Sequence, residues 1–177
     1  GIGLSTLPSE IRRLWALTTL NLSHNYITTL SPDIGRLTAL NTLDLSNNKL
    51  TTLPPEIAKL TSLMSIDLSN NKLTTLPAEI GELSTLRTLL LSSNHLAKLP
   101  REIARLTALV HLDLSNNNFI AVPPDIGGLA SLYSLDISKN RLKAIPPEIA
   151  KLTSLSSLEL HNNMLTVLSP DIANLGA

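Results

Sequence analysis

A pattern of apolar residues returns every 23 residues along this chain of 177 residues, and no other feature constrains the fold as much. A fixed period of about 20–29 residues is typical of solenoids, in which each unit buries its apolar face against its neighbours. The sequence therefore predicts a single repeat domain over residues 1–177, with seven full motifs, a leading half-repeat and no distinct caps. The motif L-x-x-L-x-L-x-x-N-x-(L/I/F)-x-x-(L/V/I) begins at Leu17, Leu40, Leu63, Leu86, Leu109, Leu132 and Leu155.

Each unit divides into two halves with different periodicity. In residues 40–45, apolar and polar residues alternate, which predicts a short strand with Leu43 and Leu45 inward and Thr42 and Asp44 outward. In residues 53–60 the apolar spacing changes to three, which indicates a helical turn, and Pro and Glu suit its first positions. We expect an α/β solenoid shaped like a horseshoe, with a parallel β-sheet on the concave side and short helical turns on the convex side.

One asparagine occupies the same position in every unit, beside the leucine core. An amide at such a bend can satisfy backbone groups of successive turns by hydrogen bonding. We therefore interpret this column as a structural ladder and not as a binding site. Its members are Asn25, Asn48, Asn71, Asn94, Asn117, Asn140 and Asn163.

Composition argues against several classes of function. Lys plus Arg and Asp plus Glu both number 14, and aromatic residues make up 2% of the chain, so neither nucleic acid nor a membrane is an expected partner. There is no Cys, and the four His occupy different positions in their units, so we expect no metal and no cofactor. No residue stands out as a nucleophile or an acid–base pair, and we expect no enzymatic activity. The absence of disulfides favours either a reducing compartment, and so a cytoplasmic location, or an excised fragment of a longer protein.

The second half of the unit resembles the leucine-rich repeat family, in its 23-residue intracellular class. The segments that carry the resemblance are Leu53-Pro54-Pro55-Glu56-Ile57, Leu76-Pro77-Ala78-Glu79-Ile80 and Leu99-Pro100-Arg101-Glu102-Ile103. Ser31 and Ser169 depart from the pattern by replacing the proline. Similar units occur in Ras-binding and scribble-type scaffold proteins, in plant proteins and in bacterial proteins. The resemblance implies recognition of another protein on the concave face.

Outward-facing strand positions form a mainly acidic column along the predicted concave face. One interpretation is a stripe that attracts a basic segment of a partner protein. The other is that each carboxylate is solvated or bonded to neighbouring Ser and Thr, as a common form of the repeat. The acidic members of the column are Asp44, Asp67, Asp113, Asp136 and Glu159.

Leu90 interrupts the acidic column, where other units carry a polar side chain. The column at the start of each strand is largest and most apolar in its middle, and His111 lies between the two columns. These residues predict an apolar centre with an acidic rim, an arrangement common in protein interfaces, although ordinary surface variation is the alternative. The predicted centre consists of Met64, Arg87, Leu90, Val110, His111 and Tyr133.

The leading hypothesis is a non-catalytic protein-interaction module, as part of a signalling or scaffold protein. A second possibility is a structural array, natural or designed, that associates with itself through uncapped ends. A third is the targeting domain of a larger enzyme whose catalytic part lies outside these residues.

Overall fold

The computed structural model describes residues 3–167, 170, 172 and 175. Within them, short 3₁₀ helices and short strands alternate along the chain. The strands are β1 (Thr19–Asn21), β2 (Thr42–Asp44), β3 (Ser65–Asp67), β4 (Thr88–Leu90), β5 (His111–Asp113), β6 (Ser134–Asp136) and β7 (Ser157–Glu159). The helices are η1 (Ser9–Arg13), η2 (Pro32–Arg36), η3 (Pro55–Lys59), η4 (Ala78–Glu82), η5 (Arg101–Arg105), η6 (Pro124–Gly128) and η7 (Pro147–Lys151).

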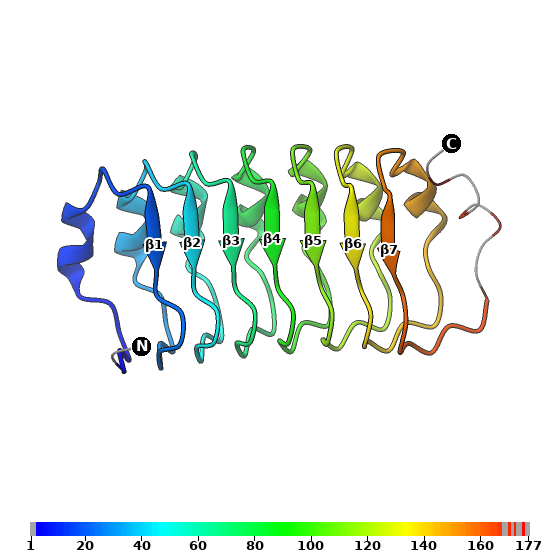
Figure 1. Cartoon of the computed structure of the whole chain (residues 1–177), viewed down its shortest axis with the longest axis horizontal. Helices are drawn as coiled ribbons and strands as arrows, with labels where there is room; N and C mark the ends of the chain where they lie inside the picture. Colours follow the sequence, from blue (N-terminus) through cyan, green and yellow to red (C-terminus); the bar gives the residue numbers. More distant parts are fainter. Residues whose placement is uncertain (1–2, 168–169, 171, 173–174, 176–177) are drawn as a thin grey trace.

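The strands form one parallel sheet whose order follows the sequence from β1 to β7 (Figure 1). Each residue pairs with the residue 23 positions later, as Leu43 does with Ile66. Backbone bonds continue this register before the strands, where the amide of Met64 donates to the carbonyl of Asn41 at 2.8 Å. The predicted solenoid fold is confirmed, and the strands are only three residues long because the chain leaves the sheet on both sides to cross the molecule.

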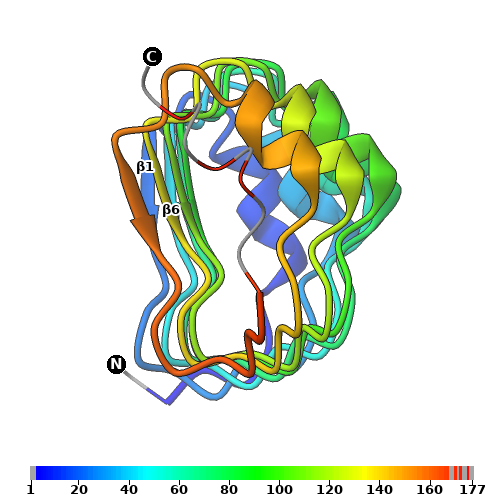
Figure 2. The ribbon, with the colours of Figure 1, turned by 90° about the vertical axis from the view of Figure 1, so that its right-hand side faces the viewer.

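The strands lie on one side of the coil and the 3₁₀ helices on the other, with the core between them (Figure 2). Leu43, Leu45 and Ile57 are fully buried, and their equivalents in the middle units form one continuous apolar column. Helical segments need more lateral room than strands, whose spacing is about 4.8 Å. The strand side is therefore the concave one.

Proline and serine begin the helical turns. In η2, the Ser31 hydroxyl accepts a hydrogen bond from the amide of Asp33 at 3.2 Å, and Pro32 follows at a position that needs no donor. The equivalent Ser169 lies outside the described residues. The other helices follow a proline in extended conformation, without a side-chain cap.

Each asparagine of the column lies a few residues after the end of its strand, where the chain turns back toward the helical side. Asn48 is typical: its Oδ1 accepts from the amide of Ile27 at 3.0 Å, and its Nδ2 donates to the carbonyl of Leu22 at 2.9 Å. Both partners belong to the preceding turn, so each amide links two successive turns. Among the described residues, no buried side-chain nitrogen or oxygen lacks a hydrogen-bond partner.

Candidate interaction surface on the concave face

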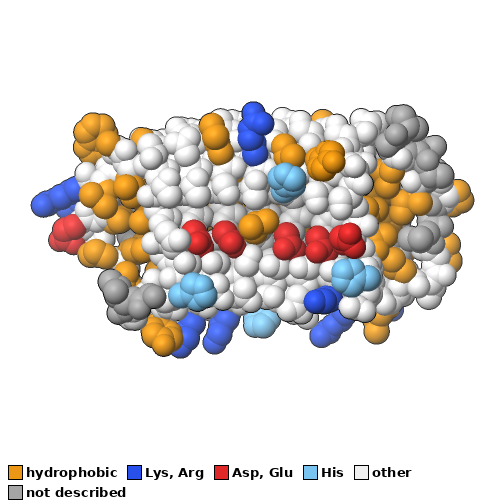
Figure 3. Space-filling model, in the orientation of Figure 1, with side chains coloured by type: hydrophobic (Ala, Val, Ile, Leu, Met, Phe, Trp, Pro, Cys, Tyr) orange, Lys and Arg blue, Asp and Glu red, His pale blue; other side chains and the backbone are white. Residues whose placement is uncertain are grey.

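The strand register brings the acidic side chains into one row across the sheet. Figure 3 shows this row on the strand face, interrupted by a single hydrophobic side chain. Leu90 takes that place, between Asp67 on β3 and Asp113 on β5. Neighbouring strands lie about 4.8 Å apart, so like charges face each other in the rest of the row. The members of the row are Asp44, Asp67, Leu90, Asp113, Asp136 and Glu159.

The aspartates of the row also have a local structural role. Oδ1 of Asp44 accepts a hydrogen bond from the backbone amide of Ser46 at 2.9 Å, and Asp136 does the same for Ser138. Asp67 and Asp113 make the corresponding bonds to Ser69 and Ser115. An aspartate that bonds a backbone amide two residues on stabilises a turn. In each of these aspartates, one carboxylate oxygen therefore bonds to a neighbouring serine, as one interpretation of the row predicts. The other oxygen remains for a partner.

Leu90 and Glu159 differ from these aspartates. The side chain of Leu90 has no acceptor atom, so the turn after β4 lacks the side-chain bond that the aspartates provide. Its half-buried side chain places an apolar group between two carboxylates. Glu159 lies beside His161 instead, with Oε2 at 3.4 Å from Nδ1, and both side chains are exposed. The row therefore has an apolar interruption in its middle and a carboxylate–histidine pair at its C-terminal end.

A second row lies just before the strands, three residues before the acidic row along each unit. Met64, Arg87, Val110 and Tyr133 follow one another, each amide donating to the carbonyl of the residue before it at 2.8–2.9 Å. Met64 is 47% exposed and Tyr133 is 51% exposed. Large apolar side chains exposed in one row are available to contact another molecule.

His111 joins this row to the acidic one. It lies at the start of β5, and its ring meets that of Tyr133 edge to face, with ring centroids 6.3 Å apart. Such contacts restrict the orientation of both rings. The register thus brings Met64, Arg87, Val110, His111 and Tyr133 into one region beside Leu90.

The described residues offer little for other chemistry. None of their groups of His, Asp and Glu is arranged to hold a metal ion. No helix among them has the length and apolar character needed to cross a bilayer.

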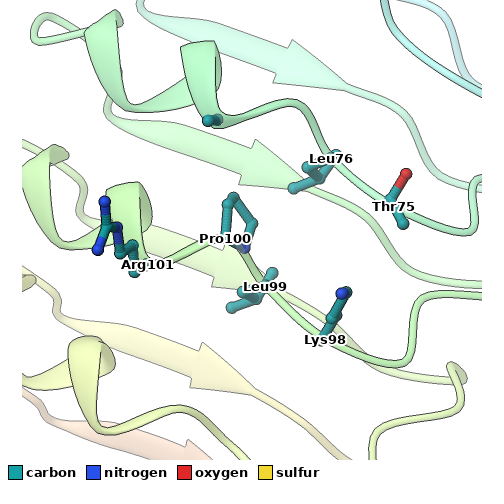
Figure 4. A pocket seen from close by; sticks show the side chains of 7 residues that line it. Thr75, Leu76, Lys98, Leu99, Pro100 and Arg101 are labelled. Atoms are coloured by element: carbon teal, nitrogen blue, oxygen red, sulfur yellow. The ribbon is translucent and has the colours of Figure 1, made fainter.

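Sequence reasoning missed two hollows on the edge loops, which follow the strands and lead back to the helical turns. One lies between Leu76 and Lys98, with Pro100 and Arg101 on its left in Figure 4. The other is more apolar and lies around Ala97 and Ile120. A sequence signal was present, since Ala97 and Ile120 stand where other units carry threonine. The edge loops comprise residues 24–30, 47–53, 70–76, 93–99, 116–122, 139–145 and 162–167.

Comparisons with known proteins agree with this architecture. A model of the leucine rich repeat matches residues 15–73, 38–96, 61–119 and 130–173. No curated protein sequence matches the chain. Among solved structures, the Leptospira interrogans LRR protein LIC12759 is 40% identical, with a TM-score of 0.90 over 98% of this chain and 50% of that one.

The LRR ectodomain of the plant membrane receptor kinase GASSHO1/SCHENGEN3 from Arabidopsis thaliana is also similar, in complex with CASPARIAN STRIP INTEGRITY FACTOR 2. It is 35% identical, with a TM-score of 0.82 over 90% of this chain and 20% of that one. The chain thus spans half the length of the Leptospira protein and a fifth of the receptor ectodomain. The repeat pattern, the parallel sheet and the matching family model together show that this chain belongs to the leucine-rich repeat family.

Proposed function

We propose that this chain is a non-catalytic interaction module that binds a protein partner on its concave face. The observation that carries the proposal is the juxtaposition of two rows on the sheet. An exposed apolar and aromatic row runs parallel to a carboxylate row, with His111 between them and Leu90 as an apolar member of the carboxylate row. Interfaces commonly combine such an apolar centre with a polar rim. The proposed contact residues are Met64, Arg87, Leu90, Val110, His111, Tyr133, Asp44, Asp67, Asp113, Asp136 and Glu159.

The charges of the two rows suggest how a partner is oriented. The acidic row carries carboxylates with one free oxygen each, which favours Lys or Arg in the facing segment of the partner. The second row, from Met64 to Tyr133, carries one cation, Arg87, among apolar side chains. A partner with apolar anchors and a flanking basic segment is therefore complementary to both rows. A cytoplasmic scaffold or signalling protein is the setting we propose for this interaction.

The test is affinity capture from cytosolic extract, followed by binding measurements with each captured protein in purified form. The test variant carries Leu90→Asp and Tyr133→Ser, residue types that other units use at these positions, so that folding is preserved. The control variant carries Arg36→Thr and Lys151→Thr on the convex side. We expect at least tenfold weaker binding for the test variant and unchanged binding for the control, since buried aromatic and apolar anchors dominate interface energies. Equal affinity of the two variants for every captured protein would refute the concave site.

Self-association is a second candidate, favoured by the ends of the solenoid. Leu20 and Leu158 are only partly buried, whereas their equivalents from Leu43 to Leu135 are almost fully buried. Figure 3 shows hydrophobic side chains gathered at both ends of the described structure. End-to-end contact would bury these leucines. Light scattering over a range of concentrations tests this, and a mass that stays at 19.1 kDa would rule it out.

A further inference from the structure

The edge loops carry positive charge and no negative charge. Residues 24–30, 47–53, 70–76, 93–99, 116–122, 139–145 and 162–167 contain no Asp or Glu, although the whole chain has 14 of each sign. Among the described residues, the acidic ones lie on the strands and the helical turns instead. The side chains of all the edge-loop cations are exposed, and they are Lys49, Lys72, Lys98, Lys139, Arg141 and Lys143. Figure 3 shows Lys and Arg side chains along the lower edge of the molecule.

These cations are available to a ligand. Within the described residues, the close ion pairs are Arg101–Glu102, Arg105–Glu82 and His161–Glu159, and none includes an edge-loop cation. Lys49 alone has another electrostatic partner, since its Nζ lies 4.6 Å from the ring centroid of Tyr26. A row of like charges without counter-charges attracts anionic groups and accelerates their association.

An apolar groove of about 620 Å³ lies on the edge loops of residues 70–76, 93–99 and 116–122. Ala97 and Ala121 form part of its wall, together with Val122 and Pro123, and Ile120 is 64% exposed beside it. Lys98 also lines the groove. Exposed isoleucine at an open groove provides apolar area that a ligand side chain can bury.

The groove and its charges do not follow from the repeat itself. The position of Ala97 and Ile120 is threonine in the units before them, as at Thr28, Thr51 and Thr74. Lys143 occupies the same position one unit later, and the amide of Arg141 donates to the carbonyl of Phe119 at 2.9 Å, so these loops are adjacent. Ala97 opens the hollow, Ile120 makes it apolar, and Lys98 and Lys143 place a cation in the neighbouring loop on either side.

We propose that this edge binds an acidic peptide segment of a partner protein, with one apolar side chain of the segment seated beside Ile120. Carboxylates on either side of that apolar residue face Lys98 and Lys143, and more distant acids face Lys72 and Arg141. Apolar walls beside separate cations favour a peptide with a discrete anchor over a membrane surface or a nucleic acid, neither of which presents a single apolar side chain between anions. The proposal is independent of the concave site.

The experiment measures binding by fluorescence anisotropy, with a labelled short peptide of Asp and Glu around one central Leu as the probe. Two control peptides replace the Leu with Ser or all acidic residues with Lys. Ile120→Thr and the double variant Lys98→Thr, Lys143→Thr restore the residue type of other units and so preserve the fold. A variant with Arg36→Thr and Lys151→Thr removes the same charge elsewhere.

We expect the acidic peptide with Leu to bind most tightly, and more weakly as salt rises. Loss of two flanking charges should weaken binding about tenfold, and Ile120→Thr should weaken it about fivefold. The variant of Arg36 and Lys151 should bind as the parent does. The proposal is overturned when the acidic peptide binds no better than its controls, or when both edge variants bind it unchanged. It is also overturned when anionic vesicles or oligothymidine bind more tightly than the peptide and Ile120→Thr does not affect them.

Discussion

Replacing Asn117 with alanine tests whether the asparagine column holds the turns of the solenoid together. The side chain is 7% exposed. Its Oδ1 accepts from the amide of Leu96 at 2.9 Å, and its Nδ2 donates to the carbonyls of Leu91 at 2.9 Å, Leu114 at 3.1 Å and Ser115 at 3.1 Å. Alanine removes all of these bonds, two of which reach the preceding turn.

The expected cost follows from the groups that lose a partner. A buried amide without an acceptor costs about 1–3 kcal/mol, and a buried carbonyl without a donor costs a similar amount at most. Leu96 is fully buried, so its amide has no access to water in the folded state. Because a carbonyl can keep a second partner, we expect a loss of about 3 kcal/mol in the free energy of unfolding. This is a large share of the roughly 5–15 kcal/mol typical of a folded domain.

The neighbouring Asn118 is the matched control, because its half-buried side chain makes no hydrogen bond within the described residues. Asn118→Ala is expected to change stability by about 0.5 kcal/mol or less. Urea unfolding monitored by circular dichroism compares the two variants, and hydrogen exchange at the Leu96 amide gives a local measure, since solenoids need not unfold in a single step. Equal stability of both variants, with unchanged exchange at Leu96, would refute the structural role of the column.

Three further predictions concern the backbone and one ion pair. Lys139 has a φ of 52°, a left-handed conformation that Asn tolerates better, so Lys139→Asn should raise the free energy of unfolding by about 0.5–1 kcal/mol, and a lower urea midpoint would contradict this. Gly127→Ala would place a Cβ 2.8 Å from the carbonyl oxygen of Glu148, so thermal unfolding should show a loss of about 1–3 kcal/mol, and an unchanged Tm would contradict the close approach. The hydrogen bond from Arg101 lowers the pKa of Glu102 below its ordinary value, so this pair stabilises the fold above the unfolded-state pKa and the contribution is lost as the pH falls. An NMR titration should show the pKa of Glu102 rising in Arg101→Ala, and no change would contradict this assignment.

Some features of the candidate site could be predicted from the sequence, because residues one repeat apart become neighbours on the sheet. Since every strand pairs with the residue 23 positions later, Asp67, Leu90 and Asp113 had to be neighbours once the solenoid was inferred. Ser31 departs from the repeat by replacing proline, and in the structure its hydroxyl accepts a hydrogen bond from the amide of Asp33. The contact residues themselves remain a proposal, since a surface row does not by itself identify a partner.

Other features depended on how side chains meet across turns. Sequence periodicity did not indicate that His111 and Tyr133 pair edge to face, because ring orientation depends on the packing around both residues. The bond from the Ser46 amide to Asp44 is local by contrast, and it matches the sequence-based interpretation that the carboxylates bond to neighbouring serines.

The sequence by itself determined the period, the order of the strands, the inward and outward faces, and the column of asparagines, because each of these repeats with the chain. The tertiary structure alone decided how the departures from the repeat shape the surface. Ala97 and Lys98, Ile120, and Lys143 come from three successive units and lie around one groove or in the loop beside it. The physical reason is that stacking brings residues of neighbouring units into contact, so a groove depends on the volumes and charges of several units at once.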